Sequence, residues 1–572
     1  MKTLPFRIKS IQVETDLLFL TGSALMGGSL RANLLRVIRV LGLSSWWGER
    51  SDVLSQLLIF YGSLFLILAV ISFSLNKSGE GLLAKVLQWM KNPAAGAKTD
   101  DKQPSGRVVN FNGWLAAAIA TGAGIRGYFL SQPMRGDEAY TFLNFAHKGI
   151  ISLFDYPVPN NHVLNTLLIK ISTLAWGGSP AAIRLPAFLA GVASIPLTYL
   201  LARELSPRKY SGVLAAVAVA IFPYLILYST NARGYALVTM LGLALAVAGL
   251  RYTTHPSVRG ILGMAVLSAL GMWAIPVMLF PIAGVFFWLA AVLWQEKQPL
   301  KMILFEFTIP FGGLSALFTL ILYTPVMVVS NGIRAIIANK FVESQSWPEF
   351  ITLFIPKIQV TLIEILRDIP VALTICGAML VIAGLYLSLR ERNWRTFLML
   401  PGLVCGAVVL LAVQHTTPYA RQWIYALPFI FMLGEHGFTS LAENLSPGWQ
   451  TPARAVLVIL GFIYSVKLAS GNVITKYPDT SAFPEAPIAA QFLKSMLAKG
   501  DAVRVTNTAD WSVYYYFWYY GIPYSPDEKQ ADAGKTFIIV KKSRYSLEDM
   551  TDKPAVKLLD FEDLALYQVT AP

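Results

Sequence analysis

The sequence predicts an all-α polytopic membrane protein, with about 12 or 13 transmembrane helices and a small C-terminal α/β domain. Three observations lead to this fold class. The 572 residues are 55% hydrophobic and only 14% charged, which is too apolar for a soluble protein. Apolar runs long enough to cross a bilayer recur between residues 57 and 468. After Ser470, short stretches of alternating charged and apolar residues replace them.

Charge and cysteine content narrow the class of protein. The formal net charge is +14, but many of the basic residues fall in short loops between apolar runs. Membrane topology and anionic lipids explain such a distribution, so nucleic acid is not an expected partner. The only cysteines, Cys376 and Cys405, both lie inside apolar runs. We therefore expect neither a disulfide framework nor a cysteine-based metal site.

Residues 1–106 form an N-terminal extension with one or two membrane segments. Residues 57–73 are long enough to span, whereas residues 17–30 suit either a span or a surface helix. The first 30 residues end in no small-residue cleavage pattern, so we do not expect a removable signal peptide. A polar linker over residues 76–106 contains five lysines, which indicates the cytoplasmic side. No role follows for the extension.

The cytoplasmic linker sets the orientation of the core, residues 107–470. It makes residues 114–130 run outward and places Asp137 outside. Residues 162–176 are expected to lie on the outer surface as a juxtamembrane helix, because a crossing there would put the basic loop after residue 201 outside. Residues 331–368 suit an outer loop with interfacial helices. The remaining predicted spans are residues 183–201, 214–228, 235–250, a hairpin over 261–294 broken near Pro276, 304–323, 371–389, 397–413, 423–441 and 455–468.

Residues 471–572 are predicted to form an α/β domain on the same outer side as Asp137. A helical pattern covers residues 488–497, and strand-like patterns cover 502–506, 537–540 and 564–569, with an aromatic run at 514–520. Such a domain covers a substrate, docks a partner or is a passive cap. The sequence leaves these alternatives open.

Polar residues that a membrane protein normally avoids gather at the outer ends of four predicted helices. Together they supply carboxylates for a proton, arginines for an anion, and amides and aromatic rings for a sugar-like ring. We therefore expect them to converge on one outer cavity. The four stretches are residues 135–141 (Arg-Gly-Asp-Glu-Ala-Tyr-Thr), 159–166 (Pro-Asn-Asn-His-Val-Leu-Asn-Thr), 228–235 (Tyr-Ser-Thr-Asn-Ala-Arg-Gly-Tyr) and 415–423 (His-Thr-Thr-Pro-Tyr-Ala-Arg-Gln-Trp).

In this order and spacing, the four stretches resemble the integral-membrane glycosyltransferases of the GT-C superfamily. The elements that carry the resemblance are the Asp-Glu pair, Asn-Asn-His-Val-Leu-Asn-Thr, Tyr-Ser-Thr-Asn-Ala-Arg-Gly-Tyr and Pro-Tyr-Ala-Arg. The group they are most similar to comprises bacterial relatives of protein O-mannosyltransferases and lipid A aminoarabinose transferases. The resemblance extends over residues 112–468 and excludes the N-terminal extension.

The resemblance implies transfer of a sugar from a polyprenyl-phosphate-linked donor to an acceptor hydroxyl outside the cytoplasm, usually with inversion. Such a reaction needs a base for the acceptor proton, and Asp137 is the candidate. It also needs fixed positive charge for the departing phosphate. Arg233 and Arg421 are the candidates, with Lys340 in the long outer loop as a third. Arg135 is assigned to a lipid headgroup or a carboxylate.

For several candidate site residues, a purely structural role is also open. Glu138 is a catalytic candidate beside Asp137, or a second ligand with Asp137 for a divalent cation, or a helix cap. Asn161 and His162 are candidates for substrate binding, although both residue types also begin helices. Three further substrate-binding candidates are Tyr235, His415 and Tyr419.

Two rival functions remain at this point. A transporter or flippase of lipid-linked sugars would use the same charges to guide a headgroup, but it favours an internal repeat of spans, which the sequence lacks. A non-catalytic scaffold subunit would retain the fold alone. The acceptor is open among protein, glycolipid, polysaccharide and other membrane lipids. The expected location is a bacterial-type inner membrane, with the site facing the periplasm or exterior.

Overall fold

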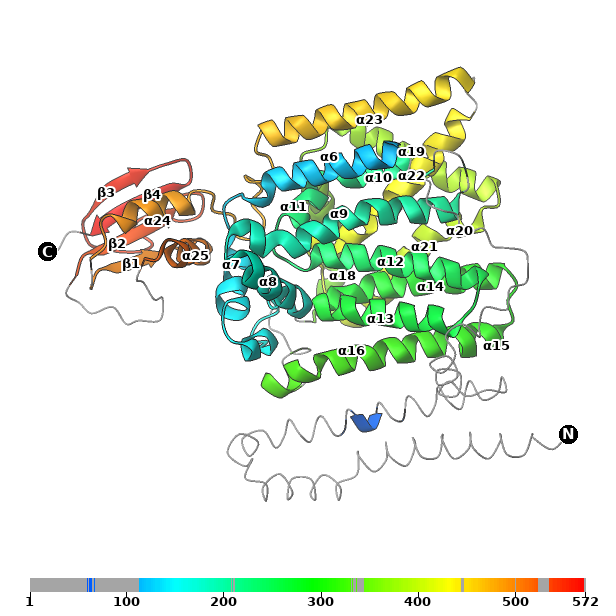
Figure 1. Ribbon diagram of the computed structural model, residues 1–572, viewed down its shortest axis with the longest axis horizontal. Coiled ribbons are helices and arrows are strands. Elements are labelled where there is room, and N and C mark those ends of the chain that lie inside the picture. The colour runs from blue at the N-terminus through cyan, green and yellow to red at the C-terminus, as the bar shows by residue number, and fades with distance from the viewer. Residues whose placement is uncertain are drawn as a thin grey trace, which may run out of the picture.

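The computed structural model describes residues 113–569, except 207, 209–210, 331, 333–335, 337–343, 444–446, 499 and 523–533, together with residues 59, 61–63 and 66. The side chains of residues 447–450 and 453 are also not described. The chain forms a bundle of long helices with a small α/β domain at one end (Figure 1). This confirms the predicted fold class. Apart from the few residues named, the predicted segments of residues 1–106 lie outside the described residues.

Each span predicted from residue 114 onward is helical. Among the described residues, six helical segments are long and apolar enough to cross a membrane by length and composition: Pro180–Leu205, Tyr235–Thr254, Pro276–Gln295, Leu300–Val329, Val371–Arg390 and Trp394–Gln414. The helices of the bundle are α6 (Gly113–Leu130), α9 (Pro180–Leu205), α10 (Val213–Ile221), α11 (Pro223–Ser229), α12 (Tyr235–Thr254), α13 (Val258–Ala274), α14 (Leu279–Gln295), α15 (Leu300–Met302), α16 (Ile309–Val329), α19 (Val371–Arg390), α20 (Trp394–Phe397), α21 (Met399–Gln414), α22 (Leu427–Ala442) and α23 (Pro447–Ser470).

Short turns of other helix types join some of these elements. The predicted break near Pro276 is a 3-10 turn, Pro276–Met278, between α13 and α14. A π-helical turn, Ile303–Thr308, precedes α16, and a 3-10 turn, Ala420–Ala426, precedes α22.

One predicted span is not continuous. Residues 214–228 form α10 and α11, which are separated at Phe222 because Pro223 cannot continue the hydrogen-bonding pattern and holds the preceding residue extended. The buried Arg126 of α6 donates hydrogen bonds to the carbonyls of Val219 (2.9 Å) and Ala220 (2.6 Å) at this break. These bonds satisfy backbone groups that water cannot reach inside a membrane.

Helices α19 and α22 lie so close together that each needs glycine at the contact. A Cβ atom on Gly384 would lie 2.1 Å from the carbonyl oxygen of Leu433, and one on Gly437 would lie 2.2 Å from that of Leu380. Small residues at helix contacts in membranes allow this close backbone packing.

Shorter helices gather at the end of the bundle that faces the α/β domain (Figure 1). Helix α8 is a shorter apolar helix. Its predicted juxtamembrane position stays a prediction. The elements are α7 (Gly136–Thr141), a π-helical turn Phe142–Ala146, a 3-10 turn Ile150–Phe154 and α8 (Val163–Trp176). Helix α18 (Trp347–Leu366) is longer and lies within residues 331–368, the predicted outer segment, of which residues 331, 333–335 and 337–343 are not described.

The C-terminal domain has a four-stranded sheet in the order β1-β2-β4-β3, with β1 parallel to β2 and the other pairs antiparallel. The edge strand β3 was not predicted, because its exposed and half-buried positions do not alternate. The predicted aromatic run lies in helix α25. The elements are α24 (Ala486–Lys494), β1 (Ala502–Val505), α25 (Asp510–Tyr520), β2 (Thr536–Lys541), β3 (Ala555–Asp560) and β4 (Leu564–Val569).

The domain packs directly on the helices that carry the first polar motif. One buried cluster contains Ala139 and Phe142 from the α7 region together with Val513 and Phe517 of α25. The hydroxyl of Tyr515 donates a hydrogen bond to the carbonyl of Gly178 at 2.8 Å. The C-terminal domain therefore helps to hold α7 in place.

Candidate active site

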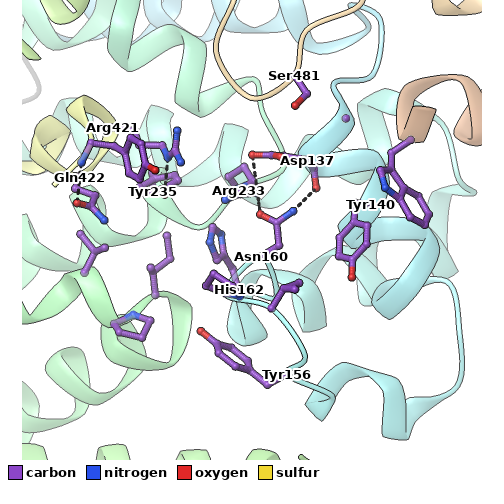
Figure 2. Close-up of a pocket in the computed structure, with 18 of the residues that line it drawn as sticks. Asp137, Tyr140, Tyr156, Asn160, His162, Arg233, Tyr235, Arg421, Gln422 and Ser481 are labelled. Carbon is purple, nitrogen blue, oxygen red and sulfur yellow. Dashed lines mark hydrogen bonds and ion pairs between the residues drawn. The ribbon is translucent and has the colours of Figure 1, made fainter. Parts of the chain in front are cut away.

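A cavity of about 600 Å³ lies where the helices at one end of the bundle meet the C-terminal domain. It combines residues from all four polar stretches with Ser481, which follows the last helix of the bundle, and with residues of the C-terminal domain. Figure 2 shows Asp137, Arg233 and Asn160 close together, with Arg421 and Tyr140 on opposite sides of Asp137. The lining residues are Gly136, Asp137, Tyr140, Tyr156, Val158, Pro159, Asn160, His162, Arg233, Tyr235, Ile275, Pro276, Val277, Ile336, Tyr419, Arg421, Gln422, Ser481, Asn507, Thr508, Asp510 and Trp511.

Asp137 is held by the backbone of the segment that follows the last span. The amide groups of Gly136 and Asp137 donate to the carbonyls of Ser481 (3.0 Å) and Thr480 (3.5 Å). A Cβ atom on Gly136 would lie 2.8 Å from the Cβ atom of Ser481, so glycine allows this close approach. The Asp137 side chain is 27% exposed, which leaves its carboxylate accessible from the cavity.

Arg233 lies beside this carboxylate. Its Nη1 atom is 3.1 Å from Oδ2 of Asp137 and also donates to Oδ1 of Asn160. The guanidinium lies 5.9 Å from the ring centroid of Tyr235. The Arg233 side chain is only 4% exposed, and an anion entering the cavity would compete with Asp137 and Asn160 for its guanidinium.

Arg421 is positioned by a residue that the sequence did not single out. Its Nη1 atom is 3.2 Å from Oδ1 of Asp479, whose other oxygen accepts a hydrogen bond from Tyr228. Its Nε atom donates to the hydroxyl of Tyr235 at 3.1 Å, and its guanidinium lies 4.4 Å from the ring centroid of Tyr419. Arg421 therefore contacts two other predicted site residues, Tyr235 and Tyr419.

His162 is buried and neutral. Burial, reinforced by the charges of Arg233 and Arg421, holds the pKa of His162 well below its usual value. Its Nδ1 atom accepts a hydrogen bond from the amide of Gly234 at 2.9 Å, so the proton is on Nε2. His162 thus orients the backbone next to Arg233 and lines the cavity as a hydrogen-bond donor.

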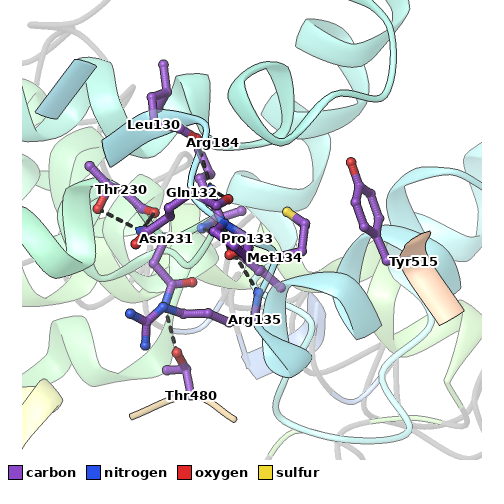
Figure 3. Close-up of polar contacts among 12 residues, drawn as sticks. Leu130, Gln132, Pro133, Met134, Arg135, Arg184, Thr230, Asn231, Thr480 and Tyr515 are labelled. Atoms are coloured by element: carbon purple, nitrogen blue, oxygen red, sulfur yellow. Dashed lines mark hydrogen bonds and ion pairs between the residues drawn. The ribbon is translucent and has the colours of Figure 1, made fainter. Parts of the chain in front are cut away.

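Glu138 is fully buried and does not line the cavity. Its carboxylate forms an ion pair with Arg184 of α9 and accepts hydrogen bonds from the amides of Arg135 (2.9 Å) and Ala232 (2.7 Å). Arg184 also donates to the carbonyls of Leu130, Gln132 and Pro133 (Figure 3). These contacts tie α7 to α9 and to the stretch that carries Arg233.

Arg135 also has a structural role, because its side chain binds backbone carbonyls. Its guanidinium donates to the carbonyls of Tyr477, Asp479 and Ile474 at 2.5 to 2.7 Å. Burial lowers its pKa to about 10. Nearby, Asn231 donates to the hydroxyl of Thr480 at 2.9 Å, a bond that Figure 3 shows. The linker to the C-terminal domain is thereby fixed against the bundle.

Besides Glu138, two predicted site residues that the structure describes, Asn161 and His415, do not line the cavity. The amide of Asn161 donates to the carbonyls of Leu153 (2.9 Å) and Asp155 (2.6 Å), and its oxygen accepts from Thr166. The ring of His415 lies 4.1 Å from that of Trp347. Lys340 lies outside the described residues.

The predicted metal alternative does not fit the side chains seen here. The carboxylate oxygens of Glu138 are taken up by Arg184 and two backbone amides, so they cannot join Asp137 on a cation. Over the part of the chain that the structure describes, no group of three or more His, Cys, Asp or Glu side chains is arranged to hold a metal ion.

The chain is similar to known proteins in part of its sequence and in its fold. The family described as dolichyl-phosphate-mannose-protein mannosyltransferase matches residues 162–329. The fold matches the crystal structure of ArnT from Cupriavidus metallidurans bound to undecaprenyl phosphate, with a TM-score of 0.50 and 12% sequence identity over 80% of this chain and 98% of that chain. The apo structure of the same protein matches with the same values. No curated protein matches the chain in sequence.

The chain is thus a multi-pass membrane protein with the fold of the GT-C glycosyltransferases, as its sequence motifs predicted. It resembles ArnT in fold over most of its length, and the mannosyltransferase family in sequence over residues 162–329.

Proposed function

We propose that the protein transfers a sugar from a polyprenyl-phosphate-linked donor to an acceptor hydroxyl on the extracytoplasmic face of the membrane. The observation that carries this proposal is the carboxylate of Asp137, 3.1 Å from Arg233 in a cavity that Arg421 also lines. A base and two fixed cations are what such a transfer needs.

Asp137 acts as the general base in this mechanism. It accepts the proton of the acceptor hydroxyl while the hydroxyl oxygen attacks the anomeric carbon. The bond between that carbon and the phosphate oxygen breaks, and the carrier phosphate leaves with one additional negative charge. Arg233 and Arg421 stabilise that charge, and attack opposite the leaving group inverts the anomeric centre.

An apolar groove next to the cavity provides a place for the lipid part of the donor. It has a volume of about 920 Å³ and is lined almost entirely by apolar side chains of α10, α18, α19, α21 and α22. Thr417, Pro418 and Trp423 line this groove, whereas Tyr419 and Arg421 line the cavity. The loop that contains these residues therefore lies between the proposed binding groove for an isoprenoid chain and the proposed phosphate site.

Lys357 adds a further cation at this junction. It lines the apolar groove, and its Nζ atom lies 5.0 Å from the ring centroid of Tyr419. The guanidinium of Arg421 lies 4.4 Å from the same centroid. We therefore assign Lys357 to the carrier phosphate, together with Arg233 and Arg421.

The experiment that tests the proposal is turnover by the Asp137→Asn variant. Purified protein in lipid nanodiscs receives undecaprenyl-phosphate hexoses and a membrane glycolipid extract, and released undecaprenyl phosphate is measured. Loss of a general base lowers the rate by about 100-fold or more, so the variant should be nearly inactive. Asp549→Asn, at an exposed carboxylate of the C-terminal domain, is the matched control and should retain full activity.

Two results would contradict the proposal. Full activity of Asp137→Asn would remove Asp137 from the base role. No release from any lipid-linked donor by the wild-type protein, together with movement of intact donor across the bilayer, would favour a flippase.

A further inference from the structure

One wall of the cavity is not explained by the proposed chemistry of Asp137 and the arginines. Tyr140 of α7 and Asn507, Thr508, Asp510 and Trp511 of the C-terminal domain form it; we call it the interdomain wall. Figure 2 shows Tyr140 on the side of Asp137 away from Arg421. The wall therefore lies across the base from the proposed phosphate site.

The interdomain wall combines aromatic surface with hydrogen-bonding groups. The rings of Tyr140 and Trp511 meet edge to face, with centroids 4.7 Å apart and planes at 89°. Both side chains are half-buried, so part of each faces the cavity. Asp510 is beside Trp511, and the buried hydroxyl of Thr508 has no hydrogen-bond partner among the described residues.

Backbone strain occurs in the interdomain wall, at Thr508, and in the neighbouring segment that packs on α7, at Thr480 and Ser481. Thr508 has φ of +75°, and Thr480 and Ser481 both have φ of +58°. Residues other than glycine rarely adopt this conformation, which costs about 1–3 kcal/mol each and is found mainly at functional sites. The strained segments face α7, because the carbonyls of Ser481 and Thr508 are each 3.5 Å from where a Cβ atom of Gly136 would lie.

We propose that the interdomain wall binds a sugar ring of the acceptor, so that the acceptor is a glycan or glycolipid. Aromatic rings pack against the apolar C–H face of a pyranose, while carboxylate, amide and hydroxyl groups bind its hydroxyls. The donor sugar is tethered to the phosphate at Arg233 and Arg421. A ring across Asp137 from Arg421 is thus the acceptor, whose hydroxyl must reach the base.

This inference rests on the proposed function of Asp137, but its test does not depend on turnover. Saturation-transfer NMR measures binding of a panel of methyl hexosides and methyl aminohexosides to the full chain in nanodiscs. A short Ser/Thr peptide is measured in parallel. Trp511→Leu and Asp510→Asn should each weaken glycoside binding by about tenfold, since aromatic contacts and hydrogen bonds to a charged group contribute at this scale.

Controls separate this inference from the proposed reaction. Tyr519→Leu, at an exposed aromatic residue of the same helix that does not line the cavity, should bind glycosides normally. Asp137→Asn should also bind them, whether or not it is active. Trp511→Phe keeps an aromatic ring and should retain glycoside binding. This result would show that a substitution at position 511 does not by itself abolish binding.

Three outcomes would overturn the inference. Binding of the peptide but of no glycoside would point to a protein acceptor. Glycoside binding unchanged in both Trp511→Leu and Asp510→Asn would remove the interdomain wall from the site. Displacement of the glycoside by undecaprenyl phosphate would place the sugar on the donor side.

Discussion

Asp137 and Glu138 are neighbours in the chain, yet their carboxylates have different surroundings. Asp137 faces the cavity and is partly exposed, whereas Glu138 is fully buried against Arg184. A base must reach solvent or substrate, so the exposed carboxylate suits proton transfer. The buried one suits a positioning role, because its contacts fix α7 and the stretch that carries Arg233.

Replacing Glu138 by glutamine should destabilise the protein strongly. The change leaves the buried guanidinium of Arg184 without its counter-charge, which typically costs about 3–5 kcal/mol. Thermal unfolding in detergent measures the loss. Glu204→Gln, at an exposed pair with Arg251, is the control and should change stability by less than about 1 kcal/mol. Equal melting temperatures for the two variants would contradict the assignment of Glu138.

His162 should make stability depend on pH. Its folded pKa is well below its unfolded value of 6.5, so below pH 6.5 the unfolded chain binds the additional proton. Stability contributed by neutral His162 is therefore complete above this pH and is lost as the pH falls. Between pH 7.5 and 5.5 the loss is about 1 kcal/mol.

The measurement for His162 is the difference in melting temperature between pH 7.5 and 5.5. His162→Gln has no proton to gain at this position, so it should lose less stability on acidification than the wild type. Identical pH dependence in both proteins would show that His162 does not titrate in this way.

At the scale of elements, glycine contacts decide how tightly α19 and α22 pack. Gly384→Ala should destabilise the protein, because the new Cβ atom would lie 2.1 Å from the carbonyl oxygen of Leu433 and the helices must separate. Overpacking of this kind costs about 1–3 kcal/mol. Thermal unfolding measures it. Gly377→Ala in the same helix meets no atom within 4 Å and should leave stability unchanged or slightly raised. A smaller effect at Gly384 than at Gly377 would contradict the predicted packing.

At the scale of the whole molecule, the proposed function requires that the cavity and the C-terminal domain lie on the extracytoplasmic face of the membrane. Basic loops favour a cytoplasmic position for Arg395, whereas the segment after Ser470 contacts Asp137 and should lie outside. Reporter fusions after Arg395 and after Ser470 should therefore report opposite faces. A cytoplasmic result at Ser470 would place the cavity on the wrong side for an extracytoplasmic acceptor.

The arrangement of the whole molecule also separates what the sequence predicted from what it left out. The long apolar helices from residue 114 onward followed from the lengths of the apolar runs. The meeting of Asp137, His162, Arg233 and Arg421 followed from polar residues at the predicted outer ends of these helices. Bilayer thickness sets the length of a span, and backbone groups in lipid must bond within it, so local sequence carries this information.

By itself, then, the sequence determined the long apolar helices, the resemblance to GT-C enzymes and most of the polar groups of the cavity. Only the tertiary structure decided the positioning of Glu138 by Arg184, the pairing of Asp479 with Arg421 and the closure of the cavity by Trp511. These partners are distant in the chain, and no local periodicity or motif records which of them will meet. Packing of the C-terminal domain against α7 brings Trp511 to the cavity, because the two share one buried apolar cluster.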